Sequence, residues 1–468
     1  MTVVTSISSA WRRRNIESTL PALVFLISAF LAGGYYESTY SLLAAFVWLS
    51  LAATVALHGM PRPSAATIVL LGLAGWTLLS ALWGPAGPAL RAAPLVALYA
   101  GLLWFAESFE PKPALEAMVA AISIVCAAAL VGRITGLAPT GGGAHSQRLA
   151  WPVAYVNGLG LVAVSGVVLA LGLRLSPRNR WTAVSLCGAT AVLSFSRSAL
   201  LVGGAALLVL AGARGRIPRT AAIVGAIVLA LGAGALAKPV AARFAAPAPD
   251  ERNARRLLDL SGHGRTELWR SAWHEGRDRP LAGGGAGSWP RAYIAETHSL
   301  AGPANAHSLY LETFAELGVV GLAFVLGFVV IVLVRGREEP AALAVFAAFV
   351  LHAAADWDWQ LPAATLPAIV CAGALHARRG QPVRTPELAA VCALVIGLAA
   401  GVHGVGAALL EDGIHSQQRA RTAALLLPYD ARPYAVLPAD RARACRIDPG
   451  EPVLLRAVPP DGGCQAVR

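Results

Sequence analysis

Four side chains of complementary chemistry lie in or beside the polar connections between apolar segments: Arg197, Arg265, His307 and Asp356. A guanidinium can bind phosphate oxygens through paired hydrogen bonds. A histidine at the mouth of a membrane segment can act as a base, an acid or a hydrogen-bond donor to phosphate. A carboxylate can orient the arginines or accept a proton from a substrate hydroxyl. The four types together favour a site that binds phosphate and moves a proton.

Arg265 opens a pattern with helical spacing. Arg265, Trp269 and Trp273 recur every four residues after two glycines, so they are expected on one face of a helix. Two indoles on one face are typical of an interfacial helix that rests on the membrane. The guanidinium at its N-terminal end could then contact phosphate, helped by the helix dipole. The alternative is an ion pair between Arg265 and Glu267 or another nearby acid.

Arg197 and His307 each occupy the mouth of a predicted membrane segment. Arg197 lies in the turn 194–198, between two segments of about 15 residues, roughly 22 Å each at the rise of an α-helix. A recessed arginine needs a partner or a water-filled cavity, so an anion-binding role competes with simple snorkelling. His307 comes just before an apolar segment, where a capping or packing role is the alternative to a chemical one.

Asp356 and Asp358 lie in the run Asp356-Trp357-Asp358-Trp359 at the expected outer end of a segment. Their spacing of two puts them on different faces of a helix, so we do not expect a joint catalytic carboxylate pair. Each could support the arginines. The tryptophans could equally belong to an aromatic belt at the membrane interface.

Two other kinds of site are not predicted. The glycine-rich run 280–289 lacks the Lys-Ser/Thr ending and the preceding strand of a phosphate loop, and it predicts a turn with close backbone approach. The histidines at 263, 298 and 307 do not fall at metal-ligand spacings with carboxylate or thiolate support. We therefore expect neither a metal ion nor a soluble cofactor.

The elements that must position these residues are membrane helices. The chain has 468 residues, of which 56% are hydrophobic and only 14% charged, with a mean hydropathy of +0.60. Backbone groups in lipid must be satisfied internally, and the apolar runs lack the alternation of barrel strands. We predict an all-α integral membrane protein with about 12–13 transmembrane helices. The segments are 20–35, 40–57, 65–83, 91–108, 114–137, 151–174, 181–196, 198–212, 221–237, 308–334, 340–356, 361–376 and 387–409.

The distribution of Lys and Arg orients these segments. Most short connections on one side are rich in Arg, whereas the opposite ones carry only Arg91, Arg133, Arg148 and Arg197. By the positive-inside rule the N-terminus is cytoplasmic, and the first segment is an uncleaved signal anchor. The predicted parts are N-terminal membrane helices (1–237), one large extracytoplasmic loop with helices (238–307), C-terminal membrane helices (308–409) and an extracytoplasmic tail (410–468). The loop is expected to cover a membrane-facing cavity.

The tail has two short helical patterns, broken at 428–430 and 448–450, and it faintly resembles a tetratricopeptide helical hairpin. Cys445 and Cys464 fall in this tail, where an oxidising compartment permits them to pair. The formal charge of +12 reflects the cytoplasmic-loop bias and does not predict nucleic-acid binding; the excess outside could serve an anionic ligand or lipid headgroups. Fully apolar segments argue against a pump or a coupled transporter.

In combination, several motifs resemble the O-antigen ligase and O-antigen polymerase superfamily of multispanning glycosyltransferases. They are Ser196-Arg197-Ser198-Ala199-Leu200-Leu201, Gly264-Arg265 with Trp269, Pro280 with its glycine run, and Ala306-His307-Ser308 leading to Glu316-Leu317-Gly318-Val319-Val320-Gly321. They cover roughly residues 190–330. The run from Asp356 to Trp359 resembles a subset of the superfamily. Many members have Asn where this chain has Ser308.

The resemblance implies a metal-independent enzyme in the bacterial cytoplasmic membrane. Such enzymes move a glycan from undecaprenyl diphosphate to a lipid, glycan or protein acceptor at the outer face. Arg197 and Arg265 would bind the diphosphate, His307 would orient or deprotonate the acceptor hydroxyl, and Trp269, Asp356 and Asp358 would support them. Ligase, polymerase and protein oligosaccharyltransferase remain alternatives within one fold. A non-catalytic exporter of lipid-linked glycan is the rival from another class.

Overall fold

The structure is a computed structural model that describes most of the chain. The described residues are 18–137, 148–218, 220, 265–297, 303–335, 339–377, 383–411, 416–448, 451 and 464. Within them the backbone forms helices and no β-strand, which confirms the predicted all-α class. The predicted segment 221–237, the start of the large loop up to residue 264, and the histidines at 263 and 298 lie outside the described residues.

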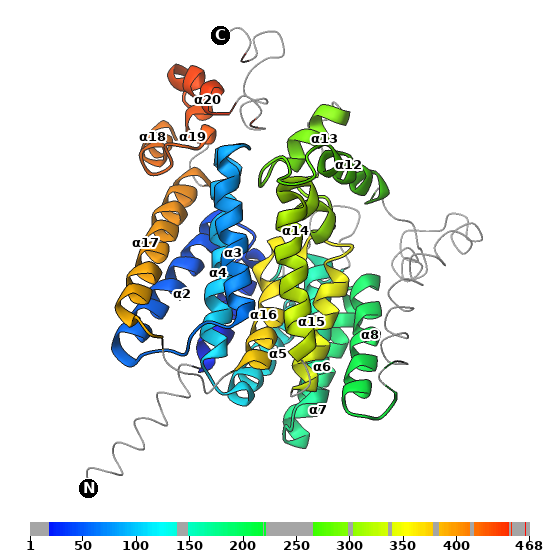
Figure 1. Ribbon diagram of the computed structural model, residues 1–468. Coiled ribbons are helices and arrows are strands. Elements are labelled where there is room, and N and C mark those ends of the chain that lie inside the picture. Colours follow the sequence, from blue (N-terminus) through cyan, green and yellow to red (C-terminus); the bar gives the residue numbers. More distant parts are fainter. Residues whose placement is uncertain are drawn as a thin grey trace, which may run out of the picture.

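The apolar helices form one bundle (Figure 1). Among the described residues, six helices are long and apolar enough to cross a membrane: α2 (Glu37–His58), α3 (Ala65–Leu79) with η2 (Ser80–Leu82), α4 (Ala86–Glu107), α5 (Pro111–Thr135), α14 (Leu309–Arg335) and α17 (Pro386–Glu411). Shorter apolar helices are Ser18–Phe30, α6 (Val156–Gly172), α8 (Arg197–Ala213), α15 (Pro340–His352) and α16 (Pro362–His376). The predicted segment 181–196 corresponds to α7 (Pro177–Leu193), and η1 (Ala32–Gly34) precedes α2.

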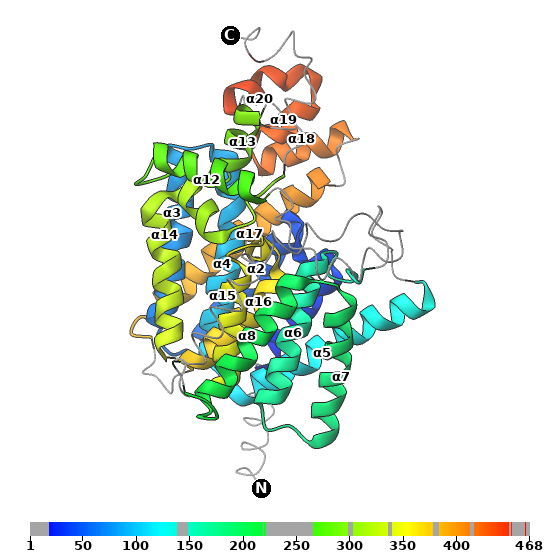
Figure 2. The ribbon, with the colours of Figure 1, turned by 90° about the vertical axis from the view of Figure 1, so that its right-hand side faces the viewer.

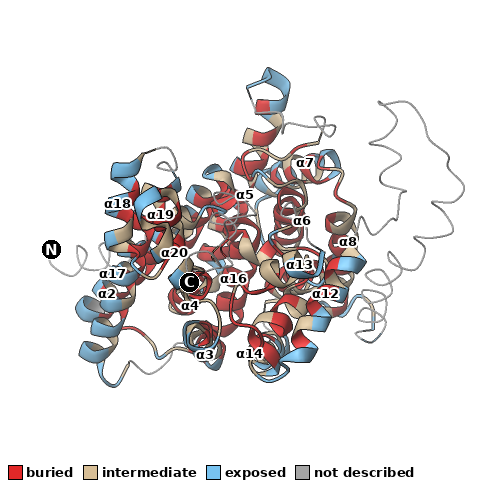
Figure 3. Ribbon diagram, turned by 90° about the horizontal axis from the view of Figure 1, so that it is seen from above, coloured by how far each residue is buried: buried red, intermediate tan, exposed pale blue. Residues whose placement is uncertain are grey.

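The bundle is built around α16. Every residue of α16 is buried, and it lies near the centre when the molecule is seen from above (Figure 3). The outermost helix α17 is different, because it exposes the apolar side chains Leu388, Val391, Val395, Leu398 and Val402. Apolar side chains with this helical spacing on an outer face are suited to contact with lipid chains.

One expected helix end is wrong. The apolar segment predicted for 340–356 ends at His352, and residues 353–357 form a loop before η3 (Asp358–Gln360). Asp356 and Asp358 are therefore not helical neighbours. Both carboxylates are fully buried. Asp356 accepts from Tyr155 of a distant segment, and Asp358 turns back to His352, the last residue of α15. Both contacts require the backbone to leave the helix after His352.

Two polar helices of the large loop and the helical tail lie at one end of the bundle. α12 (Arg265–Asp278) and α13 (Trp289–Thr297) cover α14, and the tail helices lie beside them at the same end (Figures 1 and 2). The segment 280–285 between α12 and α13 docks on α14: Gly284 N donates to Ala315 O at 2.9 Å, and Gly285 N donates to Glu316 O at 2.8 Å.

Glycine is needed on both sides of this junction. Gly283 has φ 68°, and a Cβ there would lie 2.3 Å from the carbonyl carbon of Glu316. Gly318 has φ 66°, where α14 kinks, and its Cβ would lie 2.3 Å from the carbonyl carbon of Leu281. The prediction of a turn with close backbone approach in the glycine-rich run is confirmed.

The tail forms three short helices, with a fourth, single-turn element between the last two. They are α18 (Gln417–Leu426), α19 (Ala431–Val436), η4 (Pro438–Asp440) and α20 (Arg441–Ile447). The expected two-helix hairpin is thus wrong in its second half, which is divided at Pro438. A disulfide joins Cys445 to Cys464.

Ion pairs attach the tail to the membrane helices. Arg91 of α4 contacts Asp430 at 3.2 Å and Glu451 at 3.3 Å. Arg432 contacts Glu37 of α2 at 2.8 Å and Asp430 at 2.6 Å. Because Asp430 is completely buried in this cluster, the tail is held as part of the fold at the end of the bundle that carries α12.

Candidate active site

Asp356 is the centre of the candidate site. Its side chain is 0% exposed, and four side chains from distant segments meet at it. Tyr155 Oη donates to Oδ1 at 2.5 Å, Asn157 Nδ2 donates to Oδ2 at 2.8 Å, and an Arg265 terminal nitrogen lies 3.2 Å from Oδ2. His307 Nδ1 lies 3.5 Å from Oδ1. The structure thus brings together three of the residues predicted from the sequence: Arg265, His307 and Asp356.

Hydrogen bonds hold the backbone of His307 at the preceding amide and at its own carbonyl. Its φ of 53° is in the left-handed region, which is costly for a residue other than glycine. The preceding amide, Ala306 N, donates to Glu312 Oε2 at 2.6 Å, and Trp269 Nε1 donates to the His307 carbonyl at 3.3 Å. These contacts stabilise the strained conformation. The side chain remains 23% exposed, so the ring is fixed yet accessible.

α12 supplies Arg265 and Trp269 to the site. Arg265 is the first residue of α12. It pairs with an acid, as the alternative allowed, but the acid is Asp356 and not Glu267. The expectation that both indoles rest on the membrane is wrong for Trp269, which turns inward to His307. The buried side chains Leu268 and Ala272 pack α12 onto the protein. This packing places the N-terminal end of the face that carries Arg265 and Trp269 at the site. Trp273 is half exposed, and its ring centroid lies 5.4 Å from that of Phe314.

Asp358 belongs to a separate buried chain of contacts. It is hydrogen-bonded to His352 Nδ1, and His352 Nε2 lies 2.8 Å from the Ser198 hydroxyl. The His352 and Asp358 side chains are both completely buried. Asp356 and Asp358 therefore have different partners, and the expectation that they do not form a joint carboxylate pair agrees with this geometry.

Arg197 is linked to the site through its neighbours. It begins α8 directly before Ser198, and it follows the turn whose carbonyls at Ser194 and Phe195 bind Arg148 at 2.9 and 3.0 Å. Arg148 also lies 3.4 Å from Asn157 Oδ1, and Asn157 contacts Asp356. Two routes thus tie the Arg197 turn to the 352–358 loop, one through Arg148 and one through His352.

The electrostatics favour an ionised Asp356. Burial by itself would raise the pKa of this carboxyl, but His307, His352 and Arg265 outweigh burial and hold the pKa well below its usual range. Burial dominates at Asp358 and raises its pKa despite the contact with His352. A negatively charged Asp356 can orient the His307 ring and the Arg265 guanidinium.

Several contributors were not predicted from the sequence: Tyr155, Asn157, Arg148, His352 and Glu312. Tyr155 and Asn157 are polar residues at the start of a predicted apolar segment, and this was the only local signal for them. His352 was visible only as a histidine in an apolar run. Nothing in the local sequence connects it to Ser198, because that contact is purely tertiary.

The described residues contain no group of three or more His, Cys, Asp and Glu side chains that could hold a metal ion. What the site does contain is a carboxylate-oriented histidine beside a guanidinium. Such a pair can accept a proton from a hydroxyl while the guanidinium binds an anionic group.

The region that holds most of this arrangement is similar to a known family. Residues 182–326 match the family model described as O-antigen ligase. The matched region includes Arg197, Arg265 and His307, whereas Asp356 lies beyond its end. No curated protein matches the chain. The match supports the O-antigen ligase superfamily, whose members are glycosyltransferase-like membrane enzymes.

Proposed function

We propose that this protein transfers a glycan from undecaprenyl diphosphate to an acceptor hydroxyl at the outer face of the bacterial cytoplasmic membrane. The observation that carries the proposal is the attachment of Arg265 and His307 to one buried carboxylate, Asp356. A transferase for such a donor needs a cation for the diphosphate and a base for the hydroxyl, close together. The match of residues 182–326 to the O-antigen ligase family model supports the same class of reaction.

In the proposed reaction, His307 is the general base. Its Nδ1 faces Asp356, so Nε2 is the nitrogen that takes the proton from the acceptor hydroxyl. The hydroxyl oxygen forms a bond to the anomeric carbon, and the bond between that carbon and the diphosphate oxygen breaks. The electron pair leaves with undecaprenyl diphosphate. Asp356 stabilises the positive charge that His307 gains.

Arg265 and Arg197 bind the leaving diphosphate in this scheme. Arg265 uses one terminal nitrogen for Asp356 and has 25% of its side chain exposed, so further N–H groups can reach phosphate oxygens. Arg197 begins α8, where the positive end of the helix dipole also favours an anion. Fixed donors of this kind stabilise the charge that develops on the leaving group without a metal ion.

The predicted membrane orientation supports an outer-face site. The bias of Lys and Arg assigns the segments around Arg197 and His307 to the outside. α12 and the tail helices lie at the same end of the bundle (Figure 1), as this orientation requires. The N-terminus is then cytoplasmic, and the substrates are a lipid-linked donor and an acceptor that meet at the membrane surface.

Analysis of lipid carriers in a deletion strain tests the proposal. Loss of a transferase leaves glycan-loaded undecaprenyl diphosphate in the outer leaflet, because export continues while consumption stops. Loss of an exporter instead traps the loaded carrier in the inner leaflet, and that result would reject the transferase. Complementation with the His307→Ala variant is expected to leave the accumulation unchanged.

A further inference from the structure

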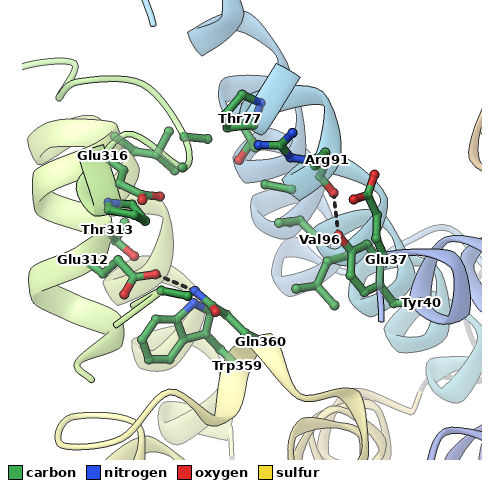
Figure 4. Close-up of a pocket in the computed structure, with 18 of the residues that line it drawn as sticks. Glu37, Tyr40, Thr77, Arg91, Val96, Glu312, Thr313, Glu316, Trp359 and Gln360 are labelled. Atoms are coloured by element: carbon green, nitrogen blue, oxygen red, sulfur yellow. Dashed lines mark hydrogen bonds between the residues drawn. The ribbon is translucent and has the colours of Figure 1, made fainter. Parts of the chain in front are cut away.

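A cavity of about 490 Å³ opens beside the candidate active site, at the same end of the bundle. Its walls come from α2, α4, α14 and the segment around η3, and Figure 4 shows α14 on one side facing α2 and α4 on the other. Its volume is within the range of roughly 300–1,000 Å³ usual for small-ligand sites. The reaction scheme above assigns nothing to it.

One wall carries carboxylates that have no cationic partner. Glu312, Thr313 and Glu316 project from α14 (Figure 4). Glu312 is only 4% exposed and accepts from two neutral donors, Ala306 N at 2.6 Å and Gln360 Nε2 at 2.6 Å. Glu316 accepts from Trp289 N at 3.3 Å. Within the described parts of the chain neither glutamate forms a salt bridge, so free lone pairs remain for hydroxyl donors.

Aromatic rings complete the lining. Trp359 lies at the floor beside Gln360, and Tyr40 faces it from α2 (Figure 4). Tyr36, which is about half exposed, lies at the margin. Aromatic faces offer flat apolar surface next to polar groups. The C–H face of a sugar ring stacks on such a surface while its hydroxyls reach carboxylate and amide oxygens.

The charges of the cavity disfavour a phosphate. Its two arginines, Arg91 and Arg432, are already paired with Asp430, Glu37 and Glu451. Glu312 and Glu316 present carboxyl oxygens, and the lining has no further Lys, Arg or His side chain. An anionic group would find no free cation there, whereas the hydroxyls of a neutral polyhydroxylated ring would find hydrogen-bond partners. Arg265 and Arg197, which suit the diphosphate, are not among the lining residues.

The cavity and the active site share two chain segments. Ala304 and Leu309 line the cavity on either side of His307 in the sequence, and Trp359 and Gln360 follow Asp356. Glu312 accepts a hydrogen bond from the amide of Ala306, the residue before His307. A ligand that contacts Glu312 would therefore act on the segment that carries the proposed base. We propose that this cavity binds an uncharged sugar ring of one transfer substrate and presents it to His307. The inference rests on the proposed function.

The sugar could belong to the acceptor or to the glycan of the donor, and kinetics distinguish these sources. Glu316→Gln keeps an acceptor oxygen for Trp289 N and replaces the second carboxyl oxygen by an amide nitrogen. Trp359→Leu removes the stacking surface. Matched controls are Glu116→Gln on α5 and Trp181→Leu on α7, both on exposed surface. We expect each cavity variant to raise the KM for one substrate about tenfold, as loss of one good hydrogen bond or one stacking contact would, with kcat little changed. The substrate whose KM rises identifies the source.

A binding measurement separates this inference from the proposed function. The probe is the diphosphate-free glycan released from the cells' own lipid carrier by mild acid, titrated calorimetrically against the purified full-length protein, with the lipid-free acceptor glycan as a second probe. Binding by wild type that weakens about tenfold in both variants supports the cavity even if no transfer occurs. Unchanged KM values and unchanged binding of both probes in folded Glu316→Gln and Trp359→Leu would overturn it.

Discussion

Nδ1 of His307 lies 3.5 Å from Oδ1 of Asp356, although one residue precedes α14 and the other follows α15. The same carboxylate binds Arg265 through its other oxygen. A single buried anion therefore sets the position of both the proposed base and a proposed phosphate ligand. Proton transfer by His307 and phosphate binding by Arg265 thus both depend on the side chain of Asp356, which anchors the two residues.

Substitution of the anchor is expected to cost most of the activity. In Asp356→Asn, an amide replaces the charge that orients His307 and Arg265, so we predict a fall in kcat of at least about 100-fold. Asp278→Asn, an exposed position on α12, is the matched control and should retain wild-type activity. Transfer assays on purified proteins with equal size-exclusion profiles make the comparison. Near-normal kcat in Asp356→Asn would remove Asp356 from the mechanism.

The His352 contacts are expected to stabilise the turn that carries Arg197. In Ser198→Ala, the buried His352 Nε2 loses its partner, which should lower the free energy of unfolding by about 1–3 kcal/mol. The measurement is the thermal unfolding midpoint in detergent. Ser123→Ala removes a hydroxyl bound only to its own helix backbone and serves as control. Equal midpoints for the two variants would show that the His352 contact contributes nothing.

The kink of α14 requires glycine at position 318. In Gly318→Ala, the new Cβ would lie 2.3 Å from the carbonyl carbon of Leu281 at a φ of 66°, so a loss of about 1–3 kcal/mol or more is expected. Gly327 is in the same helix, and a Cβ added there would meet no atom of the described chain within 4 Å. Gly327→Ala should therefore leave the unfolding midpoint unchanged or raise it. A reversed order of the two midpoints would contradict the docking of the glycine-rich turn on α14.

Attachment of the tail should depend on pH in a defined direction. Burial would raise the pKa of Asp430, but Arg91 and Arg432 outweigh it and hold the pKa well below its usual range. A carboxyl with a lowered folded pKa stabilises fully above its unfolded pKa of about 4, and this contribution is lost as pH falls through the folded pKa. The hydrogen-exchange protection factors of residues 417–447, which correct for the pH dependence of intrinsic exchange, should therefore be constant from pH 8 to about 5 and fall only in stronger acid.

A variant checks that the effect belongs to Asp430. Asp430→Asn should show fast exchange of the tail already at neutral pH, whereas Asp440→Asn, for which no buried partner is seen in the described chain, should behave as wild type. Loss of protection between pH 8 and 6 in the wild type would mean that another group holds the tail.

The positions of the helices could be predicted well from the sequence. Hydropathy alone locates segments such as 65–83 and 361–376, because a helix in lipid must be apolar over its length. Helix ends were harder to predict. The helix before Asp356 ends at His352, earlier than predicted, because polar side chains there bind partners across the bundle.

Several residues of the site could be predicted from the sequence, but most of the contacts between them could not. Arg265, His307 and Asp356 were identified by residue type and by their place beside apolar segments. A carboxylate partner for Arg265 was also expected, but the sequence did not decide between Glu267, which is closer along the chain, and Asp356. Tyr155 and Asn157 were missed because their contact with Asp356 joins the start of α6 to the loop after α15, and no local pattern encodes such a contact.

The central claim is that His307, oriented by Asp356, deprotonates the acceptor while Arg265 binds the diphosphate. The most direct measurement is transfer by the purified protein from lipid-linked glycan to acceptor, comparing wild type with His307→Ala and Arg265→Ala. We predict that each variant keeps its fold and loses at least about 100-fold in kcat/KM. Full activity in both variants would contradict the account.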